Sequence, residues 1–155
     1  MTVVAATLVT LVSLGASGYM LWQQRTAAHN RQLAAEFTAV ARQGITALMS
    51  IDPDHARSDV QAMLDASTGD LNSELSVMSA LMVKKAEESK VGNKVSVEGV
   101  AVESLSDNTG VVLVAAKTDA TGPDEAKPPP ALFRLSVTIS RDRGKLKMSK
   151  IDYLS

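Results

Sequence analysis

The chain of 155 residues carries 16 Lys and Arg against 17 Asp and Glu, a formal net charge of −1, and no cysteine. This charge balance, with an aromatic content of 3%, excludes the basic patch and base-stacking surface of a nucleic-acid-binding domain. The lack of cysteine excludes disulfides, thiol nucleophiles, cysteine metal sites and a lipoprotein anchor.

Residues 2–24 contain no Asp, Glu, Lys or Arg. A helix needs about 20 mainly apolar residues to cross a hydrocarbon core of roughly 30 Å. Tyr19 and Trp22 lie near the downstream end, where amphipathic rings favour the headgroup level. The pattern predicts three parts: a transmembrane anchor at 1–24, a membrane-proximal helix at 25–50, and one α+β domain at 51–155.

Two other interpretations of residues 2–24 stay open. A cleaved signal peptide normally has a basic start and a small-residue cleavage site. Here the best such site, Ala16-Ser17-Gly18, lies inside the apolar run. A buried core helix of this length would normally carry charges. The membrane anchor is preferred over both.

Small side chains in a membrane span let a second helix approach closely. The span therefore has a predicted partner-binding face, formed by Leu11, Ser13, Gly15, Ser17, Gly18, Tyr19 and Trp22. The alternative is that Gly and Ser are simply common in membrane spans. Arg25 and Arg31 lie downstream of the span and no basic residue lies upstream. The positive-inside tendency would place the C-terminal domain in the cytoplasm, on the strength of these two charges.

Three helices are expected before the sheet. Apolar residues at steps of three and four predict an amphipathic helix over 26–49. Asp52 and Pro53 predict the start of a second helix, which runs to Ser67 and stops at Gly69. Asp70 is the expected cap of a third helix, which closes in charged residues up to Lys90. The spacing of its methionines, with that of the second helix, predicts core positions for Met63, Met78 and Met82.

From residue 91 the apolar period changes from 3.6 to 2, which predicts four antiparallel strands. The alternation shifts by one residue at Gly99, and again between Met148 and Ile151; a shift of this kind is typical of a β-bulge. A turn is expected at Ser106–Gly110, and a polar loop at Asp119–Pro130. Because bulges curve a sheet, the predicted fold class is α+β, with the helices on one side of a curved four-stranded meander.

Catalysis needs a nucleophile, an acid or base with a tuned pKa, or a metal. His29 and His55 both lie in polar stretches, and His55 with Asp59 forms an exposed pair rather than a metal site. Glu98 and Glu103 are expected on a solvated face. The sequence therefore predicts no enzyme, no catalytic residue, no cofactor and no metal.

Several segments together resemble the Mce-associated membrane proteins of mycobacteria and related actinobacteria. The likeness is carried by the anchor that ends Tyr19-x-x-Trp22, the helix from Ala35 to Arg42, and the segment Leu48–Asp52. It continues in the strands Val95–Val102 and Ile151–Leu154, and so covers nearly the whole chain.

The resemblance implies a cystatin-like cone domain outside the cytoplasm, against the weak charge signal. It implies a non-catalytic accessory subunit of an Mce-type ABC importer of lipids, sterols or fatty acids. Its partners would be the integral membrane permease, the Mce proteins and membrane lipid, with no nucleic acid. The alternative is a membrane-tethered lipid-binding module or small-ligand enzyme of the cone fold.

Overall fold

The computed structural model describes residues 28–122 and 128–155. These fall into two compact units, one that ends at Ala35 and one of Glu36–Ser155, and the fold described below is that of the second. In the described part of the chain no helix is long and apolar enough to cross a membrane. The predicted span at 2–24 lies outside the described residues.

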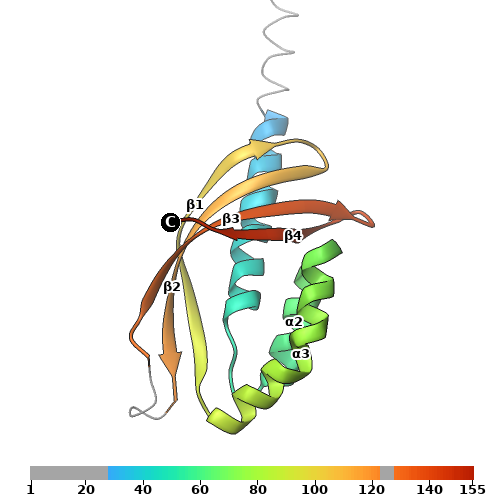
Figure 1. Cartoon of the computed structure of the whole chain (residues 1–155). Coiled ribbons are helices and arrows are strands. Elements are labelled where there is room, and N and C mark those ends of the chain that lie inside the picture. Colours follow the sequence, from blue (N-terminus) through green and yellow to red (C-terminus); the bar gives the residue numbers. More distant parts are fainter. Residues whose placement is uncertain (1–27, 123–127) are drawn as a thin grey trace, which may run out of the picture. The chain divides into compact units, whose positions relative to one another are not determined.

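The predicted fold class is confirmed for the described residues (Figure 1). A first helix is described over 28–49 and is followed by α2 (Ala56–Ala66) and α3 (Gly69–Ser89). The sheet then runs in the order β1-β2-β3-β4, all antiparallel. Its strands are β1 (Gly92–Leu105), β2 (Thr109–Thr121), β3 (Ala131–Asp142) and β4 (Lys145–Tyr153).

Both predicted bulges are confirmed. The β1–β2 register skips Glu98, next to Gly99, and the β3–β4 register skips Ser149. A third bulge, at Glu103, was not predicted. Glu98 and Glu103 are exposed, as expected. β2 also continues to Thr121, three residues into the predicted loop, because its last residues pair with the start of β1.

The core lies between the first helix and the inner face of the sheet. Phe37, Ala41 and Ile45 have no exposed surface and follow one another at steps of four. A Cβ on Gly44 would lie 2.6 Å from the Met148 sulfur, so a side chain at residue 44 would have to displace the Met148 side chain. The sheet contributes its alternate, nearly fully buried residues: Val112, Val114, Ala116, Leu135, Val137, Ile139 and Met148.

The second helix begins later than predicted. Asp52 does not cap it: the Asp52 carboxylate accepts the Asp54 backbone N–H at 3.0 Å, and Pro53 lies in a turn before the helix. His55 is the N-cap residue, without a side-chain cap bond. α2 then buries one face, with Met63 only 1% exposed, as predicted.

The corner between α2 and α3 is fixed to β4 and to the end of β3. The Thr68 backbone N–H donates to the Met148 carbonyl at 2.8 Å, and the Thr68 hydroxyl donates to Asp142 at 3.0 Å. Ser67, at 1% exposure, donates to the Leu64 carbonyl and accepts from Asn72. Gly69 does not end the second helix but begins α3, with φ of +61°.

The predicted core packing of α3 is wrong for one of its two methionines. Met78 is 52% exposed, while Met82 is half-buried. In the whole of α3 only Ala86 is buried. The helix therefore rests on the domain by a narrow edge and leaves much of its apolar surface in solvent.

Candidate functional site

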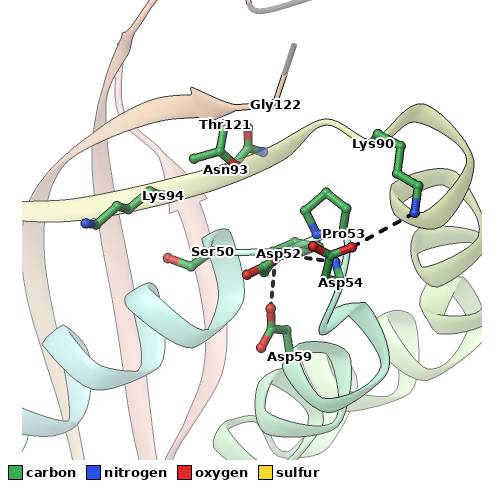
Figure 2. A pocket seen from close by; sticks show the side chains of 11 residues that line it. Ser50, Asp52, Pro53, Asp54, Asp59, Lys90, Asn93, Lys94, Thr121 and Gly122 are labelled. Atoms are coloured by element: carbon green, nitrogen blue, oxygen red, sulfur yellow. Dashed lines mark hydrogen bonds and ion pairs between the residues drawn. The ribbon is translucent and has the colours of Figure 1, made fainter.

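Residues 50–55 link the first helix to α2, and we call them the link. A polar cleft of about 480 Å³ lies where the link meets the start of β1 (Figure 2). Two backbone hydrogen bonds between Ile51 and Asn93, of 3.0 and 2.9 Å, close its floor. The Ser50 hydroxyl accepts the Val95 backbone N–H at 3.1 Å. The link is therefore held against β1 by backbone pairing.

Three carboxylates, those of Asp52, Asp54 and Asp59, lie at this cleft, and each forms a contact that holds the link in place. Asp59, from α2, accepts the Asp52 backbone N–H at 2.8 Å, and Asp54 lies 4.0 Å from the Lys90 ammonium. In Figure 2 these side chains lie around the cleft, with Asp54 turned toward Lys90. Over residues 28–122 and 128–155, no three acidic or histidine side chains converge closely enough to hold a metal ion.

The pKa of Asp52 lies below its ordinary value, because its carboxylate accepts the Asp54 backbone N–H and a hydrogen bond from His55. The predicted pairing of His55 with Asp59 is wrong: the His55 Nδ1 atom lies 3.3 Å from Asp52 instead. The His55 side chain is 70% exposed, in agreement with the predicted exposed position. His29 is also exposed. The polar groups of the cleft therefore hold the link against β1 and α2.

The exposed side of α3 carries three large apolar side chains. Val77 is 85% exposed, Leu81 64% and Met78 52%. Large apolar side chains cost free energy in water, about 25 cal/mol for each Å² left exposed. We call Val77, Met78 and Leu81 the α3 apolar face. The spacing of apolar residues did not predict this face, because it does not distinguish the exposed Val77 and Leu81 from the half-buried Leu75 and Met82. A helical projection separates them, since Val77 and Leu81 share a direction with Glu74, Lys84 and Glu88.

A second apolar surface lies on the outer face of the sheet. A shallow cleft of about 440 Å³ is lined there by residues of β1, β2 and β3 and by Leu154. Its hollow follows from small side chains, because Gly99 pairs with Ala115 and Ala101 pairs with Leu113. Arg134 also lines the cleft and is exposed, and its guanidinium forms no ion pair with any described residue.

The predicted partner-binding residues of the span, Leu11 to Trp22, lie outside the described residues.

The domain fold is shared with several solved structures. An IcmL-like type IV secretion system protein from Legionella pneumophila matches with a TM-score of 0.63 at 7% identity, over 77% of this chain and 91% of that chain. A periplasmic fragment of TraM matches with a TM-score of 0.60 at 12% identity, over 77% and 95%. The VirB8 protein of Agrobacterium tumefaciens matches with a TM-score of 0.55 at 11% identity, over 79% and 92%. At these identities the likeness shows the fold alone.

Sequence comparison is more specific. The chain is 39% identical over 140 residues to the uncharacterized protein Rv1363c of Mycobacterium tuberculosis. That match covers 90% of this chain and 54% of the relative, so the chain spans about half the length of the relative it matches. A family model matches residues 1–155 in full, and the chain belongs to the family described as "Uncharacterized protein Rv1363c/MT1408-like".

Proposed function

We propose that this protein is a non-catalytic accessory subunit of an envelope complex, tethered by residues 2–24, with its domain outside the cytoplasm. The observation that carries the proposal is the α3 apolar face, which presents three large apolar side chains to solvent. Exposed apolar patches of this kind mark surfaces that other molecules cover. The charge-free run at 2–24 supports the tether.

The complex we propose is an Mce-type lipid importer. The segment resemblance to Mce-associated membrane proteins supports this choice, with the permease and the Mce proteins as partners. Two solved structures of the same fold are described as periplasmic, the TraM fragment and the domain of DotI, which matches with a TM-score of 0.61 at 11% identity. That similarity concerns fold alone, but a domain outside the cytoplasm agrees with it.

The first test is partner recovery. Tagged full-length protein is solubilised from native membranes in mild detergent, captured, and its partners are identified by mass spectrometry. The wild type is expected to recover the permease and Mce proteins, and Leu81→Asp is expected to lose them. Leu132→Asp is the matched control, because Leu132 is 76% exposed but lies on β3. Recovery of no transporter component by the wild type contradicts the proposal.

Membrane orientation has its own test. Protease added to intact spheroplasts is expected to digest the C-terminal domain and leave a cytoplasmic marker intact. A domain protected in intact spheroplasts and digested after lysis would place it in the cytoplasm, as the two arginines suggest.

A second candidate function, a lipid-binding module, is favoured by the outer-sheet cleft. Its apolar floor suits an alkyl chain, and the exposed Arg134 suits an anionic head group. A fluorescent fatty acid is expected to bind the wild type, and Ala115→Trp to abolish binding by filling the hollow. Equal binding by the variant and the wild type would refute this function.

A further inference from the structure

Another cleft lies where the end of α3 meets the start of β1. α3 ends at Ser89 and β1 begins at Gly92, so the chain turns there directly from helix to sheet (Figure 1). The cleft has a volume of about 560 Å³ and is lined by the last two turns of α3, the start of β1 and Ile51 of the link. Sites for small ligands typically have volumes of about 300–1,000 Å³. We call it the α3–β1 cleft.

The floor of the α3–β1 cleft is apolar. Met82 and Ala86 of α3 lie one turn apart in its lining, together with Ile51 and Val91. Ala86 is 7% exposed and the other three residues are half-buried. None of the residues that line this cleft is acidic, whereas three carboxylates line the polar cleft. The lining therefore suits the apolar body of a ligand and does not repel an anion.

The exposed polar residues of the lining offer hydrogen-bond donors. They are Lys85, Ser89 and Asn93, and Asn93 also lines the polar cleft. The Ser89 hydroxyl accepts the Val91 backbone N–H at 3.2 Å and keeps its own proton to donate. The Lys85 ammonium has three protons to donate and no lone pair to accept with. A carboxylate, which only accepts hydrogen bonds, matches this set.

Lys85 is also the charge that the protein leaves available at this end of α3. The other charged side chains nearby form ion pairs at 3.2–4.0 Å: Glu87 with Arg57, Glu88 with Lys84, and Lys90 with Asp54. Within the described part of the chain Lys85 forms no ion pair. The C-terminal end of a helix carries about half a negative charge, which is less than the full positive charge of a lysine. The cleft therefore presents a net positive group to a ligand.

We propose that the α3–β1 cleft binds a compact apolar carboxylate. The carboxylate would bind the Lys85 ammonium and the Ser89 hydroxyl, and the apolar body would pack on Met82, Ala86 and Ile51. The row from Met82 to Ser89 is about 10 Å long, which favours a compact acid over a long alkyl chain. This site goes beyond the proposed function: it is separate from the α3 apolar face and from the outer-sheet cleft, and partner recovery does not depend on it.

The methionines of α3 report on this site. Full-length protein with isotope-labelled methionine methyl groups is reconstituted in lipid nanodiscs and titrated with cyclohexanecarboxylate, followed by NMR. The Met82 methyl signal, assigned with Met82→Leu, is expected to shift and to saturate. Met78 is the internal control, because it is 52% exposed one turn earlier and does not line the cleft. No saturable shift at Met82, or an equal shift at Met78, overturns the proposal.

The charge is tested with one ligand change and two lysine variants. Neutral cyclohexanecarboxamide is expected to bind about tenfold more weakly than the acid, and Lys85→Met to weaken binding of the acid by a similar factor. Lys85→Arg should retain binding, because it keeps the charge. Lys84→Met is the matched control, since Lys84 is exposed on α3 but does not line this cleft. Thermal unfolding should be unchanged, because both lysines are exposed. Equal effects of Lys85→Met and Lys84→Met, or equal binding of acid and amide, overturn the proposal.

Discussion

Gly92 is the first residue of β1 and lies next to the pairing of Ile51 with Asn93. A Cβ built on Gly92 would overlap the Ile51 carbonyl oxygen, and would lie 2.7 Å from Pro53 Cδ and 2.8 Å from the Thr121 hydroxyl. The nearest of these is a backbone atom, so no rotamer change relieves the overlap. Gly92→Ala must therefore push the link at Ile51 away from β1.

The magnitude follows from what that movement breaks. The two hydrogen bonds between Ile51 and Asn93 are worth about 0.5–1.5 kcal/mol each. Overpacking and the backbone shift add about 1–3 kcal/mol. The expected loss of unfolding free energy is about 2–6 kcal/mol, a large part of the roughly 5–15 kcal/mol typical of a domain.

Gly99→Ala is the matched control, since its Cβ would meet only the Ala115 Cβ at 3.9 Å, an ordinary contact. Alanine there is expected to change stability by less than about 1 kcal/mol. Thermal unfolding of the full-length chain, followed by circular dichroism, should show a lower Tm for Gly92→Ala, by about 8 °C or more. Equal Tm values for the two variants would refute the reasoning.

Three further results are expected. Ile45→Ala should lower the unfolding free energy by about 2–5 kcal/mol in urea titration, because Ile45 has no exposed surface; a loss below about 1 kcal/mol would contradict the packing described. Arg57→Ala should change it by less than about 1 kcal/mol, since the Arg57–Glu87 pair is 83% and 44% exposed; a larger loss would show a buried role. The carboxyl of Asp52 should titrate by NMR below the ordinary pKa of about 3.9. Its stabilising effect should be complete above that value and lost as pH falls through the lower folded pKa; a titration midpoint at or above the ordinary value would contradict the hydrogen bonds of the link.

The sheet was predictable because its bulges leave a local trace. A bulge shifts the alternation by one residue, so the apolar face changes parity at Gly99 and again before Ile151. The bulge at Glu103 left no such trace. Leu105 is the one apolar residue of β1 that follows Glu103, and a single apolar residue is too few to reveal a change of period.

The start of α2 was not predictable from local signals. Asp-Pro is a common helix start, and Asp52 does bind a following backbone N–H. However, the Asp52 N–H is itself held by Asp59, and the preceding Ile51 pairs with β1. These contacts keep the link extended and turned, so the helix begins at Ala56. Contacts with distant residues here outweigh a local capping signal.

The same limit explains the candidate site. The spacing of apolar residues predicts that α3 is amphipathic. It does not predict which of its apolar residues the rest of the chain buries. The sheet is already filled from its inner side by the first helix, through Phe37 and Ile45. α3 therefore contacts the domain through α2 and β4, next to the corner at Thr68.

The position of α3 at the edge of the domain explains why Val77 and Leu81 are exposed. Val77 and Leu81 remain exposed in the folded domain, so hydrophobic burial of these side chains does not stabilise the fold. Their burial would stabilise a complex with another molecule. A solvent-facing row under no other constraint would be polar, as Glu74, Lys84 and Glu88 on the same side are. The apolar residues Val77 and Leu81 interrupt this polar row at its centre. We therefore interpret α3 as a helix kept for contact with a second molecule, with the rest of the domain as its support.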